Sequence, residues 1–219
     1  MALYPNLANK FYDSLWGDKV QHQPTQNAVL NTYSILSNNN VEWATIIAYS
    51  TIQQAIQNKV INSMLFAYLL QNNFFSNLAN DYIEYFNNPA PKNPVAFDKW
   101  HSKECNKIIN VLDCYAQQIA TYGIAQKIVN MTFKHLSCFS DAQTKSNHFE
   151  YCHMPIDSKI LSWIKDQKIL VTSSKTRWSR LDDQTYTNLQ NAIRGHLNSK
   201  TTVLEAEFEI WAKAKNNQP

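Results

Sequence analysis

The segment Tyr122-Gly123-Ile124-Ala125-Gln126-Lys127-Ile128-Val129-Asn130-Met131 separates two long stretches with helical periodicity. Before it, apolar residues recur at spacings of three and four, which predicts a helix over 96–120. Gly123 is expected to end that helix, because glycine favours the position that follows a helix C-terminus. A second helix is predicted over 125–139, with Lys127 in its first turn. The segment therefore predicts two helices joined by a short glycine turn.

Helical periodicity also dominates the rest of the chain. Only three of the 219 residues are glycine, which leaves few positions for the tight turns of a hairpin-rich β protein. Apolar residues make up 44% of the chain and charged residues 17%, which is typical of a globular protein with a sizeable core. We therefore expect an all-α fold. The further predicted helices span 26–38, 41–59, 61–86 (two helices or one bent helix), 183–198 and 202–215, and another helix is predicted to start at 157–158. Residues 140–153 are predicted as loop, and 168–172 as a short β-like run.

The clearest linker lies at 87–94, where three prolines fall within six residues and cannot continue a helix. The amino terminus has no basic region followed by an apolar core, so we expect no signal peptide. No apolar run approaches the ~20 residues of a membrane span. The four cysteines have no paired spacing and are expected to be reduced thiols, so we expect a cytoplasmic protein without a membrane partner.

The charge of the chain is unevenly distributed. Residues 1–89 carry three lysines against five acidic residues, whereas 90–219 carry 17 basic and 12 acidic residues. A basic half favours an anionic partner such as a nucleic acid. The alternative is a solvated surface with a chance excess of lysine.

A lysine and a carboxylate stand out as candidates for chemistry. A lysine near a helix N-terminus is disfavoured as a cation, which favours the neutral, nucleophilic amine at Lys127. Thirty residues on, Met154-Pro155-Ile156-Asp157-Ser158-Lys159-Ile160 predicts a helix start with Asp157 or Ser158 as its N-cap. The alternative for the pair is a solvent-facing lysine and an ordinary helix cap.

Both runs resemble motifs of one family. The run 123–130, Gly-Ile-Ala-Gln-Lys-Ile-Val-Asn, resembles the Gly-Val-Gly-x-Lys-Thr-Ala-Asn stretch of the helix–hairpin–helix DNA glycosylases of the endonuclease III superfamily. The run 155–160, Pro-Ile-Asp-Ser-Lys-Ile, is similar to the superfamily's Pro-Val-Asp-x-His-Val, and the two occur in the family's order. The lysine–aspartate spacing, and the apolar pattern of Val129-Asn130-Met131, are closest to the archaeal 8-oxoguanine glycosylases.

The resemblance implies an all-α, two-lobed fold with a central helix–hairpin–helix. Residues 1–90 would contribute to one lobe, 91–170 would form the lobe with the hairpin and the catalytic pair, and 171–219 would pack back on the N-terminal region. It also implies a bifunctional DNA glycosylase and AP lyase of base excision repair. Such an enzyme would act as a monomer on double-stranded DNA with a damaged base, an oxidised base of the 8-oxoguanine type.

The resemblance assigns roles residue by residue. Lys127 would attack the deoxyribose C1′ carbon, and Asp157 would assist departure of the base, which leads to a Schiff base and a strand nick. The backbone around Gly123, Ala125 and Gln126 would hold a DNA phosphate. The cysteines lack the clustered spacing of an iron–sulfur cluster, so no cofactor is expected.

A base inside a duplex has to be flipped into an aromatic slot before it is excised. Tryptophan is a suitable wall for such a slot, although most tryptophans belong to the core. In Arg177-Trp178-Ser179-Arg180, the arginines Arg177 and Arg180 are candidates for contacts with the DNA backbone, with a simple surface turn as the alternative. The candidate slot residues are Trp43, Trp163 and Trp178, with Trp100 as a fourth.

Two other interpretations stay open. Cys138, His148, Cys152 and His153 are zinc-type ligands near one loop, but their spacing matches no compact zinc pattern, so we expect no metal. His135, on an apolar helix, is expected to be a core histidine. The main rival function is a non-catalytic helical protein that binds DNA or a protein partner through the same hairpin.

Overall fold

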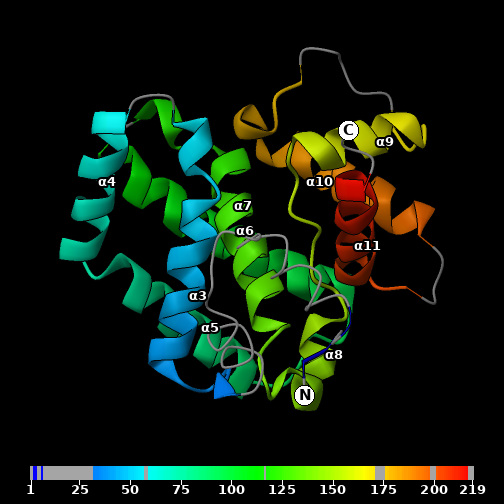
Figure 1. Ribbon diagram of the computed structural model, residues 1–219, viewed down its shortest axis with the longest axis horizontal. Helices are drawn as coiled ribbons and strands as arrows, with labels where there is room; N and C mark the ends of the chain where they lie inside the picture. The colour runs from blue at the N-terminus through cyan, green and yellow to red at the C-terminus, as the bar shows by residue number, and fades with distance from the viewer. Residues whose placement is uncertain are drawn as a thin grey trace.

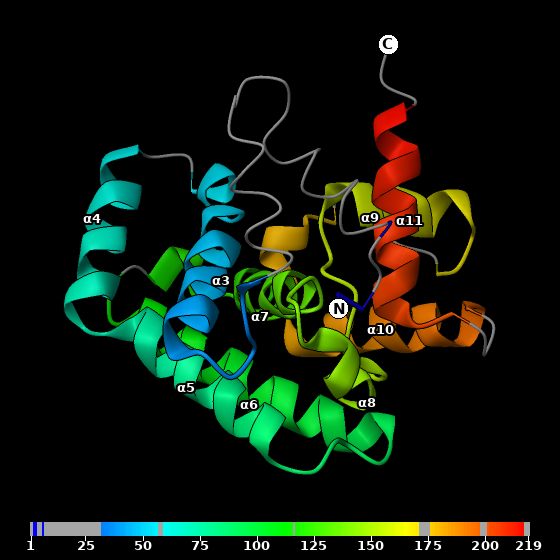
Figure 2. The same ribbon diagram turned by 60° about the horizontal axis from the view of Figure 1, so that its bottom comes forward.

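The computed structural model describes residues 2–3, 6, 32–56, 59–115, 117–170, 176–197 and 201–216. Helix α7 (Tyr122–Leu136) is the central element, and all of its residues are buried. Helices α3 (Asn38–Ser50), α6 (Pro94–Asp113) and α10 (Asp183–His196) pack around it. Figures 1 and 2 show α7 between the N-terminal and C-terminal groups of helices.

The remaining helices extend this arrangement to either side. Helix α5 packs against α3 and α4, and α11 packs against α9. Figure 1 shows α4 at one edge of the molecule and α11 toward the other. Their bounds are α4 (Lys59–Gln71), α5 (Phe74–Asn87), α8 (Ser146–Phe149), α9 (Ser158–Asp166) and α11 (Val203–Asn216), with 3₁₀ turns η2 (Gln53–Ala55), η3 (Gln117–Ile119), η4 (Ala142–Lys145) and η5 (Trp178–Arg180).

The predicted all-α fold is confirmed, since the described residues contain helices and no strand. The proline-rich linker separates α5 from α6, as predicted. Asn93 caps α6 by accepting a hydrogen bond from the Ala96 amide at 2.9 Å, and Pro94 occupies the first helical position. Proline suits that position because its fixed φ is helical and its missing N–H has no partner to lose. The division of the chain into three segments stays a prediction.

The predicted glycine turn is wrong in detail. Helix α6 ends at Asp113, well before Gly123, and α7 begins at Tyr122. Thr121 is the N-cap of α7, and its hydroxyl accepts a hydrogen bond from the Ile124 amide at 3.2 Å. Gly123 therefore lies in the first turn of α7 instead of closing α6. Lys127 is the sixth residue of α7, so it lies beyond the first turn, where the helix dipole acts most strongly.

Other predicted boundaries also shift. Residues 34–37 form a turn before α3, and 26–31 lie outside the described residues. The predicted loop 140–153 contains η4 and α8. Residues 168–170 form no strand, because Lys168 follows α9 with a φ of 54°; 171–172 lie outside the described residues. Within the part of the chain that is described, no helix has both the length and the apolar character to cross a membrane.

Candidate functional site

The two residues predicted to carry chemistry lie side by side. The Nζ atom of Lys127 on α7 is 2.9 Å from Oδ2 of Asp157 at the start of α9. The exposed fractions of the two side chains are 7% and 10%, so the ion pair is nearly buried. A solvent-facing lysine, the alternative considered for Lys127, does not describe this arrangement.

Asp157 is fixed by three hydrogen bonds. It is the N-cap of α9, as predicted, and its Oδ1 accepts hydrogen bonds from the amides of Lys159 and Ile160, both at 2.9 Å. Burial by itself raises the pKa of Asp157, but the Lys127 ammonium and the Ile160 amide hold the pKa below its usual value. Asp157 is therefore a carboxylate at neutral pH, with one oxygen bound to its helix and the other to Lys127.

The ion pair opens onto a cavity of about 800 Å³. The cavity lies between the end of α3 with η2 on one side and α7, α9, α11 and η5 on the other. Its size is within the range of clefts that hold small molecules. Its lining residues are Ser50, Thr51, Gln54, Ala55, Lys127, Met131, Lys134, Asp157, Ser158, Lys159, Leu161, Thr176, Arg177, Trp178, Ser179 and Trp211.

The cavity lining is basic. Its described residues include four basic side chains and a single acidic one, Asp157. Lys134 lies seven residues after Lys127 on α7 and forms a buried ion pair with Glu207 of α11. Burial lowers the pKa of Lys134 and raises that of Glu207, and the attraction between the two groups opposes both shifts. The Lys134–Glu207 contact was not anticipated from the sequence, since the two residues are 73 positions apart.

Two tryptophans line the cavity. Trp178, one of the predicted slot residues, comes from η5, and Trp211 comes from α11. Lys159 Nζ lies 3.8 Å from the centroid of the Trp211 ring, a cation–π contact. Trp211 was missed as a site residue because its helical spacing is that of a core residue.

The other candidate tryptophans lie elsewhere, so the slot assignment is corrected for them. Trp43 packs edge-on against Tyr33 and His135. Trp163 packs against His196, with ring centroids 5.9 Å apart. Trp100, also considered, packs in an aromatic cluster with Tyr82, Tyr85 and Phe133.

Gly123 has a packing role that differs from the predicted one. Its amide donates to the Leu181 carbonyl at 3.0 Å, and a Cβ at this position would clash with the Trp178 carbonyl oxygen. The Thr121 hydroxyl also donates to the Ser179 carbonyl at 2.8 Å. The start of α7 therefore holds η5 in place, and with it Trp178 at the cavity.

The predicted phosphate contact at 123–126 is corrected. The amides of Gly123, Ile124 and Ala125 donate to Leu181, Thr121 Oγ1 and the Thr121 carbonyl respectively. These residues and Gln126 are buried, so their backbone offers no exposed donor to DNA. Of the two predicted arginines, Arg177 lines the cavity, whereas Arg180 is exposed and donates to the Gln118 carbonyl at 3.0 Å.

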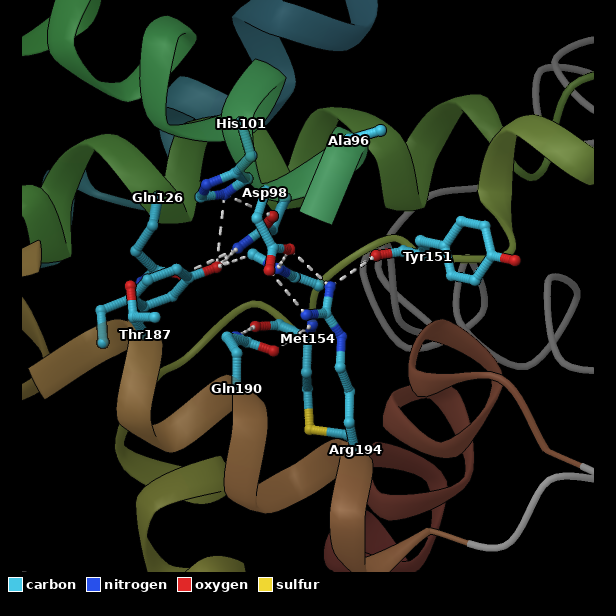
Figure 3. Close-up of polar contacts among 12 residues, drawn as sticks. Ala96, Asp98, His101, Gln126, Tyr151, Met154, Thr187, Gln190 and Arg194 are labelled. Atoms are coloured by element: carbon cyan, nitrogen blue, oxygen red, sulfur yellow. Dashed lines mark hydrogen bonds and ion pairs between the residues drawn. The ribbon is translucent and has the colours of Figure 1, made fainter. Parts of the chain in front are cut away.

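A buried polar network joins residues of α6, α7 and α10 (Figure 3). Tyr186 Oη is its centre: it accepts from Asn130 Nδ2 at 2.8 Å and lies 2.8 Å from His153 Nδ1. His153 Nε2 is 2.8 Å from Asp98, which also binds the Arg194 guanidinium through both carboxylate oxygens. The network ties α6, α7 and α10 together.

The zinc-type residues do not converge. Among the described residues, no three histidine, cysteine, aspartate or glutamate side chains are grouped as metal ligands. The Cys138 thiol donates a hydrogen bond to the Lys134 carbonyl, and His148 Nε2 is hydrogen-bonded to the Asn88 carbonyl. His135 is buried against Trp43, as predicted for a core histidine.

Comparison of the chain with protein-family models, with curated proteins and with solved structures gave no match.

Proposed function

We propose that this protein is a bifunctional DNA glycosylase and AP lyase that excises an oxidised base through a Schiff base on Lys127. The observation that carries the proposal is the buried Lys127–Asp157 pair at the wall of a basic, tryptophan-lined cavity. The two residues are those that the resemblance to helix–hairpin–helix DNA glycosylases assigns to catalysis. The partner would be duplex DNA with a damaged base, bound by a monomer.

The pair has the chemistry that the reaction needs. Asp157, as a carboxylate, places a fixed negative charge where the sugar develops positive charge while the glycosidic bond breaks. Its Oδ2 accepts a hydrogen bond from Lys127 Nζ, so it can also orient the amine, whose extra proton passes to water in the cavity before attack. The amine nitrogen then bonds to C1′, and the electron pair of the glycosidic bond leaves with the base. Opening of the sugar ring gives the Schiff base, and β-elimination breaks the C3′–O bond.

The cavity suits a flipped nucleotide. Trp178 and Trp211 provide aromatic surface for a base, while Lys159 and Arg177 provide cations for the backbone phosphates. Extrusion of a base from a duplex costs a few kcal/mol of free energy, because stacking and pairing are lost. Stacking of the base against tryptophan recovers part of that free energy. 8-Oxoguanine is the first lesion to test, since the lysine–aspartate spacing is closest to that of the archaeal 8-oxoguanine glycosylases.

The test is covalent trapping by borohydride on a panel of duplexes, each with one lesion or an abasic site. Borohydride reduces a Schiff base to a stable amine, so the wild type should give a protein–DNA adduct. Lys127→Gln should give none. Asp157→Asn should slow excision by about 100- to 1,000-fold, the usual loss when a charge-stabilising group is removed.

Lys159→Gln is the matched control, because Lys159 lines the same cavity but does not pair with Asp157. With protein at saturating concentration it should still form the adduct, because the loss of a phosphate contact weakens binding but leaves the nucleophile in place. An adduct that survives in Lys127→Gln would assign the nucleophile to another lysine. The rival function, non-catalytic DNA binding, predicts binding of the same duplexes with no adduct on any of them.

A further inference from the structure

The segment 152–157 crosses the protein interior without secondary structure. All six residues are buried, and the last of them, Asp157, is the N-cap of α9. Buried backbone amides and carbonyls need hydrogen-bond partners, because an unpaired polar group in the interior is costly. The described part of the chain offers this segment no neighbouring strand, so side chains have to supply the partners.

Two glutamines supply them in the same way. Gln190 of α10 donates to the Met154 carbonyl at 2.7 Å and accepts from the Met154 amide at 3.2 Å. Gln126 of α7 donates to the Ile156 carbonyl at 2.9 Å and accepts from the Ile156 amide at 3.1 Å. Each side-chain amide therefore pairs with one residue of the segment through both backbone groups.

Gln126 differs from Gln190 in its position. It directly precedes Lys127 in sequence, and the residue that it holds, Ile156, directly precedes Asp157. Its Nε2 also donates to the Gly123 carbonyl at 2.9 Å, and its Oε1 accepts from Asn130 Nδ2 at 3.0 Å. The side chain is fully buried and makes four hydrogen bonds. Gln126 does not line the cavity.

We propose that Gln126 is the positioning residue of the site, whose amide fixes the backbone of Asp157 relative to Lys127 so that the two side chains meet. The contact between Lys127 and Asp157 joins α7 to the N-cap of α9. Its geometry therefore depends on how α9 packs against α7. Gln126 is the side chain that joins α7 to the residue next to Asp157. The effect on catalysis rests on the function proposed above, whereas the effect on the ion pair does not.

The first measurement is independent of any enzymatic activity. The pKa of the Asp157 carboxyl is measured by carbon-13 NMR titration, with Asp157→Asn to assign its signal. In Gln126→Met the pKa should shift upward, because burial raises it once Lys127 is displaced. Gln190→Met is the matched control: it removes two equivalent backbone hydrogen bonds, those to Met154, from the same segment, and the pKa of Asp157 should stay lowered.

The second measurement separates binding from chemistry. Gln126→Met should slow single-turnover base excision by about 100-fold, the effect of a small misplacement of reacting groups. The Kd for DNA should stay unchanged, because Gln126 lies outside the cavity. Gln190→Met should change the excision rate by less than about 3-fold, well below the effect of such a misplacement.

Gln126→Asn is a second variant in case Gln126→Met does not fold, since it keeps a polar amide but shortens its reach. An unchanged Asp157 pKa in a folded Gln126 variant, or equal shifts in the Gln126 and Gln190 variants, would overturn the proposal. A wild type that excises no base would refute the proposed function alone, and the NMR titration would still decide the role of Gln126.

Discussion

At the scale of single residues, two lysines of α7 that line the cavity each pair with a carboxylate, and the two pairs differ in burial. Lys134 and Glu207 expose 1% and 0% of their side chains, less than Lys127 and Asp157. Lys134 also lies over the rings of Phe208 and Trp211, at 4.6 and 5.5 Å from the centroids. Because a buried ion pair is stabilising only while both charges are present, each member should be costly to remove alone.

We expect Lys134→Met to lower the free energy of unfolding by about 3–5 kcal/mol, because it leaves the Glu207 carboxylate buried without its cation. The double variant Lys134→Met/Glu207→Leu should recover most of that loss, since apolar side chains of similar volume bury no charge. Urea unfolding of the wild type, both single variants and the double variant measures the coupling. Equal losses in the single and double variants would assign the cost to the packing of Lys134 on Phe208 and Trp211.

At the scale of elements, two glycines offer a matched comparison, because both lie within helices. Gly123 in α7 faces η5, whereas Gly195 in α10 is exposed, and a Cβ added to it would meet no described atom within 4 Å. Gly123→Ala should destabilise the protein by about 1–3 kcal/mol, since η5 has to shift away from the new methyl group. Gly195→Ala should stabilise it by about 0.4–1 kcal/mol, because alanine restricts the unfolded chain.

Thermal unfolding measures both effects, and quenching of tryptophan fluorescence by iodide reports on Trp178 at the cavity. Iodide should quench Gly123→Ala more than the wild type, and Gly195→Ala no more than the wild type. A Gly123→Ala protein with wild-type stability would contradict the role of Gly123 in seating η5.

Helix ends marked by proline or by an acidic N-cap were predictable, whereas the start of α7 and the end of α6 were not. The prolines of the linker and Asp157 marked the end of α5 and the start of α9 correctly. The end of α6 was misplaced because Asp113 is followed by neither glycine nor proline, and apolar residues continue through η3 at helical spacing. The periodicity of a sequence cannot separate a helix from a 3₁₀ turn that buries the same face.

The candidate site was predictable only in part, for a related reason. Lys127 and Asp157 lie in short motifs, so local sequence was enough to select them. Lys134–Glu207 and the contacts of Gln126 and Gln190 depend on which helices pack together, which no local spacing encodes. Trp211 has the spacing of a core residue, and its place at the cavity follows from the packing of α11 against α9.

At the scale of the whole molecule, histidines buried in a neutral form make stability depend on pH. Burial lowers the pKa of His135 to about 3 and that of His153 to about 4. The pKa of His101 is well below its usual value, because the side chain is buried and because it lies close to His153. In the unfolded chain these groups titrate near ~6.5. Between the two values the unfolded chain binds more protons than the folded protein, so acid favours unfolding.

We therefore expect full stability above about pH 6.5 and a progressive loss as the pH falls from there toward 4. Each of the three histidines contributes a slope of up to about 1.4 kcal/mol per pH unit within this window. His135→Gln should reduce the slope by about one such contribution. Urea unfolding at intervals between pH 4 and pH 7 measures the slopes, and a wild-type free energy of unfolding that is flat between pH 6.5 and pH 4 would contradict the neutral, buried state of these side chains.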